Sequence, residues 1–289
     1  MRQDVESRVN LLSRFTRRPG RTAAEATALV VAAVVAFPLY WMVLSAFKPA
    51  GEIRSAEPRP WTLAPTLDSF RRVFVQEDFG RYFLNSVVVA VAVVIASAFI
   101  AFLAATAVTR FRFRLRTTLL IMFLVAQMVP VEALTIPLFF VMRDLGQLNT
   151  LWSLILPHIA FSLPFAIWML RGFVKGVPEA LEEAAYMDGA SRTRFLWQIL
   201  FPLVLPGLVA TTVFSFISAW NDFLFAKSFI ISDISQSTLP MALLVFYKPD
   251  DPDWGGVMAA STVMTIPVLV FFVLVQRRLV SGLGGAVKD

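Results

Sequence analysis

The sequence predicts an all-α membrane protein that crosses the bilayer six times, with both termini in the cytoplasm. Three observations predict this fold class. Of the 289 residues, 57% are hydrophobic and 16% are charged, whereas soluble domains are usually roughly 45–50% apolar and about 25% charged. The apolar residues form six runs near the roughly 20 residues that one crossing needs. The cations gather between these runs, mainly on alternate sides.

The same composition excludes several classes of protein. Six crossings use most of the apolar residues, which leaves no large soluble catalytic domain. The net charge of +6 would suit nucleic acid in a soluble protein, but here the cations lie between apolar runs, so we expect no nucleic-acid partner. Cysteine is absent, which excludes disulfides, thiolate nucleophiles and cysteine metal sites.

The first three spans are placed by the scarcity of charge and by the turn residues between them. The first, 22–47, is longer than a signal-peptide core of about 7–15 residues and lacks a convincing cleavage site, so we interpret it as an uncleaved anchor. A proline-rich outer segment, 48–81, follows as an extended surface connection that could contact an outside partner. The second and third spans are predicted at 82–108 and 117–142.

The remaining spans are predicted at 151–170, 195–225 and 254–275. Orientation follows from Lys and Arg outside the spans, because cationic loops resist translocation. One side holds 17 of these cations and the other holds 9, so the termini should be cytoplasmic. We therefore predict a cytoplasmic segment 1–21, one transmembrane domain 22–276 that includes a cytoplasmic segment 171–197, and a cytoplasmic tail 277–289.

Catalytic machinery is missing from the sequence. No GK[ST] ending marks a P-loop, no GxGxxG follows a strand, and neither GxSxG nor HExxH occurs. The single histidine, His158, lies inside the fourth span, where a hydrogen-bonded packing role is favoured over ligand contact. The chain is predicted to be non-catalytic, with no metal and no cofactor of its own.

The loop between the fourth and fifth spans is hydrophilic and longer than a tight connection requires. Pro178 suits the first position of a helix, and the glutamates that follow it place negative charge at the positive end of the helix dipole. Asp188 and Gly189 then provide a turn that allows positive φ before a second helix from Ala190. These features predict a compact cytoplasmic knob.

Two interpretations of this knob remain open from the residues alone: a helix lying flat on the membrane surface, or a helix inserted into a groove of another protein. Interfacial helices need bulky apolar residues in the acyl boundary. The segment instead offers Ala184 and Ala185 among acids, which favours docking on a protein.

The run from Glu183 to Ala190, followed by Ile199 and Pro202, resembles the EAA loop of ABC importer permeases, with Phe201 in place of the usual Leu. Residues 40–288 are similar to the second permease of maltose-type carbohydrate importers. The matching segments outside the loop are Asn85-Ser86, Arg110-Phe111-Arg112-Phe113, Pro130-Val131-Glu132, Trp220-Asn221-Asp222 and 282–288.

This resemblance implies a type I ABC importer permease fold in a bacterial inner membrane. It implies a coupling helix that rests in a cleft of a cytoplasmic ATPase, with Glu183 as the acidic contact and Gly189 as the turn. Other residues of this site are Glu182, Ala184, Ala185, Asp188 and Ala190, and the tail 285–288 would be a weaker second contact. The implied partners are a second permease, two ATPase subunits that carry ATP and Mg, an external solute-binding protein and membrane lipid.

Polar residues inside the spans are candidates for the substrate pathway, because charges in hydrocarbon are costly and should face protein or water. Glu132 and Asp222 are the acidic candidates, and Trp220 and Asn221 offer an aromatic plate and an amide that suit a sugar. The alternatives stay open: Asp222 wetted near the outer end of its span, Glu132 bonded to backbone freed by Pro130, and packing between helices for the other two.

The predicted function is transport of a sugar or oligosaccharide, driven by ATP that partner subunits hydrolyse. One alternative in the same family is import of a glycerophosphodiester or sugar phosphate. A more distant alternative is a secondary transporter that couples cargo to protons through Glu132 or Asp222 and needs no ATPase.

Overall fold

The computed structural model describes residues 19–76, 78–247 and 249–284, and within these ranges every regular element is a helix. The described residues fall into two compact units. The first contains the residues up to Phe70 together with Trp254–Thr262, and the second contains Arg71–Asp253 and the residues from Val263 onward. The proposed second contact at 285–288, and most of the predicted cytoplasmic segment 1–21, lie outside the described residues.

The first unit begins with the long helix α2, Pro19–Ala46, followed by the short helix α3, Ala50–Ile53. Beyond Arg54 the chain has no helix until α4, Asp68–Arg71, as the prolines predicted. This extended segment folds back on the end of α2: Lys48 Nζ donates to the Arg59 carbonyl at 2.5 Å, and Thr66 N–H donates to the Phe47 carbonyl at 2.8 Å.

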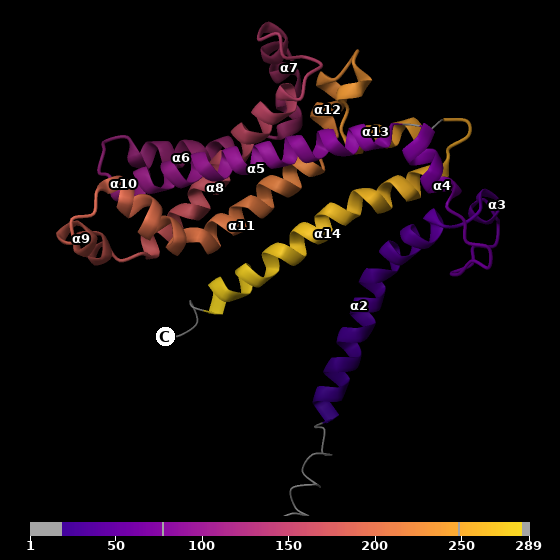
Figure 1. The fold of residues 1–289 in the computed structure, drawn as a ribbon, viewed down its shortest axis with the longest axis horizontal. Coiled ribbons are helices and arrows are strands. Elements are labelled where there is room, and N and C mark those ends of the chain that lie inside the picture. Colours follow the sequence, from indigo (N-terminus) through magenta and orange to yellow (C-terminus); the bar gives the residue numbers. More distant parts are fainter. Residues whose placement is uncertain (1–18, 77, 248, 285–289) are drawn as a thin grey trace, which may run out of the picture. The chain divides into compact units, whose positions relative to one another are not determined.

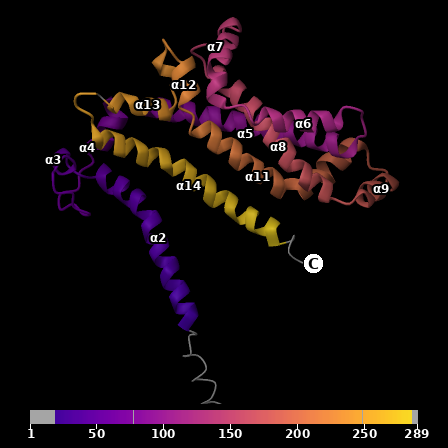
Figure 2. The same cartoon turned by 180° about the vertical axis from the view of Figure 1, so that it is seen from behind.

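The second unit is built on three long helices that lie side by side: α5, Phe79–Arg110; α8, Trp152–Gly176; and α11, Phe201–Trp220 (Figure 1; Figure 2). A π-helical turn, Arg72–Gln76, precedes α5. The sixth predicted span corresponds to α14, Trp254–Gly284. Each of these helices is at least as long as the roughly 20 residues that one crossing needs.

Five helices of the described residues are long and apolar enough to cross a membrane: Ala24–Ala46, Phe79–Arg110, Trp152–Gly176, Arg192–Trp220 and Trp254–Gln276. They confirm five of the six predicted spans, with ends shifted by a few residues. The fifth span ends at Trp220 rather than at Phe225, because the chain leaves the helix at Asn221 and starts α12, Leu224–Phe229.

The third predicted span, 117–142, is not one straight helix. The segment forms α6, Arg116–Ala126, then a 3₁₀ turn, Val131–Leu134, and α7, Thr135–Asp144, and the two halves meet at 95°. Pro130 explains the break, because it lacks an N–H and disfavours helical geometry in the residue before it. The bent pair makes a sixth, broken span, or else a re-entrant loop.

The segment after α11 and the helix α9 lie at opposite ends of the second unit. It contains α12, a 3₁₀ turn at Ile234–Gln236 and α13, Leu239–Phe246. The resemblance motif Asn85-Ser86 holds this segment to α5: Asn85 Nδ2 donates to the carbonyls of Ser235 and Ser237 at 2.8 and 2.9 Å, and Ser86 Oγ accepts from Leu239 N–H at 2.8 Å.

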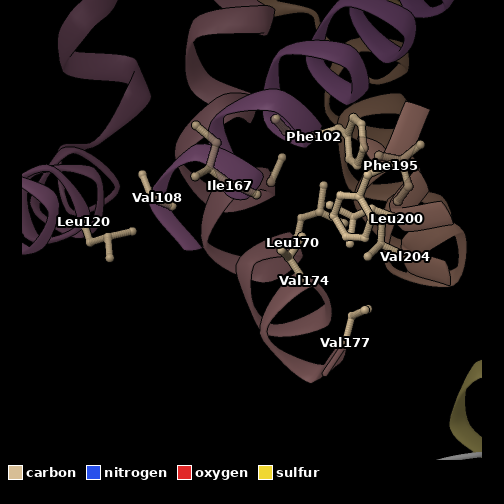
Figure 3. Packing of buried hydrophobic residues seen from close by; sticks show 14 of the residues in the cluster. Phe102, Val108, Leu120, Ile167, Leu170, Val174, Val177, Phe195, Leu200 and Val204 are labelled. Carbon is tan, nitrogen blue, oxygen red and sulfur yellow. The ribbon is translucent and has the colours of Figure 1, made fainter. Parts of the chain in front are cut away.

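The other end of the bundle contains an apolar cluster, to which α5, α8 and the start of α11 contribute (Figure 3). Phe102 of α5, Leu170 of α8 and Leu200 before α11 are essentially inaccessible to solvent. The helix α9, Glu179–Met187, lies at this end (Figure 1) and contributes Ala185 to the cluster. The predicted cytoplasmic knob is therefore attached to the core of the helical bundle.

Candidate functional site

The knob starts with α9, whose first residue is Glu179. Pro178 was predicted to be the first helical residue, but it occupies the N-cap position with extended backbone, φ −58° and ψ 137°. Glu179 and Glu182 stand in the first turn, where their charge complements the unpaired N–H groups and the positive end of the dipole.

The predicted turn after the helix is confirmed. Gly189 has φ +78°, its N–H donates to the Tyr186 carbonyl at 3.0 Å, and Ala190 N–H donates to the Ala185 carbonyl at 2.9 Å. This pair of bonds is a Schellman motif, which needs a residue in the left-handed region after the helix. Glycine adopts this conformation without the steric cost that a β-carbon adds.

The second helix of the knob begins at Arg192 rather than at Ala190. Ser191 caps it, since its Oγ accepts from Arg194 N–H at 3.2 Å. The helix α10, Arg192–Arg194, continues through a π-helical turn, Phe195–Leu200, directly into α11. Helical structure is unbroken from Arg192 to Trp220, so the second helix of the knob is continuous with the fifth span.

The helix α9 has two different faces. Ala185 is 7% exposed and packs into the apolar cluster, while Glu182 lies partly buried beside it. On the opposite face Met187 is 88% exposed, and Ala184 and Glu183 are exposed. Among the described residues, Glu183 makes no hydrogen bond and no ion pair. An acidic and apolar surface is thus presented outward, with Asp188 exposed at its end.

A residue that the sequence analysis did not assign to the site holds the inner face. Arg110, the last residue of α5, has a side chain only 6% exposed, and its Nε lies 3.3 Å from Glu182 Oε2. Its Nη2 donates to the Val177 carbonyl at 2.8 Å. The available signal was an arginine at the end of a long apolar span, in a motif noted only for its resemblance.

Tyr186 completes this inner face. Its hydroxyl donates to Glu182 Oε1 at 3.0 Å, and its ring lies 5.8 Å from that of Phe195. Desolvation raises the pKa of the Tyr186 hydroxyl, and the bond to the Glu182 carboxylate raises it further. Tyr186 therefore stays protonated and remains a donor at physiological pH.

Trp220, a predicted pathway residue, lies in the packed interior. Its side chain is 1% exposed, and its indole N–H donates to the Met264 carbonyl at 3.2 Å. Its ring packs edge-on against Phe83 and stacks on Phe216. Asn221 follows as the C-cap of α11 and is exposed.

Asp222 is turned inward. Its carboxylate accepts from the N–H groups of Phe225 and Ala226 at 3.1 and 3.0 Å, so it caps the start of α12. His158 lies nearby, with its Nε2 3.9 Å from Asp222 Oδ1 and its Nδ1 2.8 Å from the Leu154 carbonyl. The buried, hydrogen-bonded histidine agrees with the packing role predicted for it.

Glu132 lies in the 3₁₀ turn at the break of the third span and is exposed. Within the described residues its side chain makes no hydrogen bond or ion pair, so the expected bond to freed backbone is not formed. The structure thus keeps Glu132 and Asn221 accessible, and it places Trp220 and the Asp222 carboxylate in packed surroundings. Among the described residues, no group of three or more His, Cys, Asp or Glu side chains could hold a metal.

Comparisons with known proteins match most of the chain. Residues 97–284 match the family model described as "Binding-protein-dependent transport system inner membrane component". The diacetylchitobiose uptake system permease protein DasC of Streptomyces coelicolor is 39% identical over 93% of this chain and 98% of its own length. The trehalose/maltose transport system permease protein MalG of Thermococcus litoralis is 35% identical over 90% of this chain and 94% of its own length.

A third relative is the trehalose transport system permease protein SugB of Mycobacterium tuberculosis, which is 35% identical over 87% of this chain and 92% of its own length. Among solved structures, the chain is similar to one from a bacterial ABC transporter involved in the import of the acidic polysaccharide alginate. The TM-score is 0.77, the identity is 21%, and the match covers 91% of this chain and 98% of the other. At that identity the likeness concerns the fold.

Proposed function

We propose, from the premise that the chain belongs to the family of binding-protein-dependent transport system inner membrane components, that α9 is the coupling helix through which partner ATPases drive it. The chain is a multi-pass inner-membrane permease subunit of an ABC importer for sugars or oligosaccharides. It is non-catalytic and binds no cofactor, because ATP is bound by the ATPase partners. Family membership excludes the alternative of an ion-coupled secondary transporter.

The observation that carries the proposal is the outward face of α9. A helix intended for the membrane surface would place bulky apolar residues toward lipid. Here the exposed face combines Glu183, Ala184 and Met187, a small acidic surface that fits a groove with basic groups. Glu183 has no partner within the described residues, so its carboxylate is available for such a contact.

The proposed complex contains a second permease, two ATPase subunits and an external solute-binding protein. The exposed surface of α2 supports the proposal of a second permease. The residues of α2 from Ala24 to Tyr40 are all exposed, and they are mostly apolar. Lipid or another permease must cover such a helix. The unbroken helical path from Arg192 to Trp220 then converts movement of an ATPase into tilting of a span.

For the cargo, we propose an uncharged disaccharide or short oligosaccharide. The relatives named above are permeases for diacetylchitobiose, trehalose and trehalose/maltose, and none of these sugars carries a phosphate group. Glu132 and Asn221 are the better pathway candidates, because both are exposed. Trp220 and the Asp222 carboxylate would need a conformational change before they could touch cargo.

The coupling assignment is tested in the assembled importer. Glu183→Ala combined with Gly189→Val should abolish cargo-stimulated ATP hydrolysis while the spans remain inserted, because the acidic contact and the left-handed turn are both lost. Gly51→Val, at an exposed glycine of the outer segment where an added β-carbon would meet nothing within 4 Å, should leave the stimulation intact. Unchanged stimulation in the double variant would refute the assignment.

The absence of cysteine allows a direct test of contact. Met187→Cys should cross-link to a cysteine in the ATPase cleft and resist a membrane-impermeant thiol reagent added outside. Leu63→Cys is a matched control, because Leu63 is 87% exposed and Met187 is 88% exposed. Since Leu63 is on the predicted outer segment, it should react with the outside reagent and form no cross-link. The reverse pattern would place α9 on the outer side of the membrane and would refute its contact with the ATPase.

A further inference from the structure

We infer that Arg110 is a positioning residue that ties the coupling helix α9 to the spans α5 and α8, so that the three move together during transport. The inference rests on the proposed coupling function of α9. Arg110 itself contacts no ATPase and no cargo in this arrangement. It acts by holding Glu182, on the inner face of α9, against the cytoplasmic ends of two spans.

The contacts of the Arg110 guanidinium reach three elements. It ends α5, and its Nη2 donates to the carbonyls of Val177 and Val174, at 2.8 and 3.3 Å, at the end of α8. Its Nε lies 3.3 Å from Glu182 Oε2, and its Nη1 lies 3.9 Å from Glu179 Oε1, both in α9. One planar cation thus joins two spans to the coupling helix.

The chemistry of this position requires arginine. The last carbonyls of a helix have no partner inside that helix, and a cation there also complements the negative end of the dipole. The guanidinium offers five donors in a fixed fork, so here it donates to two carbonyls while its charge faces a carboxylate. A lysine ammonium is a single point of charge on a flexible stem and would satisfy fewer of these acceptors.

Among the described residues, the polar contacts between α9 and α5 are those of Arg110 with Glu179 and Glu182. Two cavities, of about 490 Å³ and about 500 Å³, are both lined by Arg110, Glu182 and Tyr186. These three side chains therefore lie where the two cavities adjoin. The apolar contacts of α9 are those of Ala185, which joins a cluster shared by α5, α8 and α11, and of Tyr186, which packs on Phe195. The Arg110 ion pairs add a directional link from α9 to the end of α5.

Burial determines the strength of this link. Exposed ion pairs contribute little, because water and salt screen them. Here the Arg110 side chain is 6% exposed and the Glu182 side chain is 22% exposed, so removal of the carboxylate would leave a buried charge without compensation. The ion pair is therefore costly to break, and the link persists while the helices tilt.

The test uses the complete importer in proteoliposomes with its ATPases and its binding protein. The readout is the amount of cargo imported per ATP hydrolysed, together with recovery of the assembled complex. Arg110→Gln should assemble, retain the Met187→Cys cross-link to the ATPase and keep cargo-stimulated hydrolysis near the wild-type rate. Its import per ATP should fall by about an order of magnitude, because α5 no longer follows the coupling helix.

Three further variants keep the inference falsifiable. Glu182→Gln, which preserves shape, should lower import per ATP in the same direction, and Arg110→Lys should give an intermediate value. The double variant with Arg110→Gln and Glu182→Gln should be no worse than Arg110→Gln alone, since both changes break one link. Arg114→Gln is the matched control: this exposed arginine of the same loop should leave import per ATP unchanged.

Import per ATP that stays at the wild-type value in Arg110→Gln or in Glu182→Gln would overturn the inference. A parallel loss of assembly, hydrolysis and import in Arg110→Lys and Glu182→Gln would also overturn it, because that pattern describes a merely structural residue. Failure of the coupling function itself is distinguished by the Met187→Cys cross-link: its absence in the otherwise unmodified importer would reject docking of α9, independently of Arg110.

Discussion

Gly207 of α11 lies directly against the aromatic ring of Phe173 of α8, so that a β-carbon on Gly207 would collide with the ring. Small residues at helix interfaces allow spans to approach closely, which strengthens their packing in lipid. Gly207 lies within the predicted fifth span, 195–225. The structure shows that its lack of a side chain is what permits the contact.

We therefore expect Gly207→Ala to destabilise the permease by about 1–3 kcal/mol, the usual cost of forcing extra volume into a packed interface. Gly172→Ala is a matched control in α8, where a β-carbon would meet nothing within 4 Å. The midpoint of thermal unfolding in detergent should fall for the first variant and stay constant or rise for the second. Equal midpoints would mean that the Phe173 ring yields without cost.

The left-handed turn at Gly189 predicts a graded response to substitution. Gly189 has φ +78°, and a β-carbon in this region costs roughly 1–2 kcal/mol, with asparagine tolerated best. The stability of the knob should decrease in the order Gly, Asn, Ala, Val. Hydrogen exchange of the amides at 184–190 measures it, and Gly176→Ala, at a glycine without positive φ, serves as control. Equal protection in all variants would contradict the requirement for glycine.

Substitutions of Asp222, whose carboxylate is turned inward, distinguish a role in helix capping from a role in transport. Asp222→Asn keeps an oxygen that can accept from Phe225 N–H or Ala226 N–H, so its unfolding midpoint should stay near wild type. Asp222→Ala removes the cap and should cost about 0.5–2 kcal/mol. If the role is capping alone, cargo uptake by Asp222→Asn should equal that of the wild type. A strong loss of uptake in a stable Asp222→Asn protein would restore Asp222 as a pathway residue.

Asn149 should hold the outer loop that follows α12. Its Oδ1 accepts from Ile231 N–H at 2.7 Å and from Ser232 N–H at 2.8 Å, and its own φ is +60°. Asn149→Ala loses both bonds and strains the backbone, so proteolysis or hydrogen exchange at 230–236 should accelerate several-fold. Asn149→Asp retains the acceptor and should change the exchange far less. Similar acceleration in both variants would point to the backbone conformation rather than to the side chain.

The knob could be predicted closely because its determinants are local. Pro178, the glutamates after it and Gly189 act through backbone geometry within a few residues, and the observed helix bounds differ from the predicted ones by one or two residues. The spans were likewise predictable from composition. The third was not, because an apolar run that is long enough to cross the membrane does not reveal whether Pro130 kinks it slightly or bends it by 95°.

The roles of individual polar side chains depended on contacts between distant segments. Gln127, beside the bend, donates its amide N–H to the Phe161 carbonyl of α8 at 3.0 Å. No local sequence pattern predicts that bond. The chemistry of Trp220 left open whether it faces a sugar or packs between helices, and its indole N–H is satisfied by the carbonyl of Met264, 44 residues later. A residue type can suggest a binding role, but only its surroundings show which partner it has.

By itself, the sequence determined that this is a polytopic α-helical membrane protein, and it predicted how the protein is oriented and where an acidic knob faces the cytoplasm. These properties follow from apolar length, charge asymmetry and helix caps, all of which are written along the chain. Only the tertiary structure decided that Arg110 meets Glu182 and that Asp222 caps α12. Such pairings arise because packing brings together groups far apart in sequence, and a buried polar group must find a partner wherever the fold provides one.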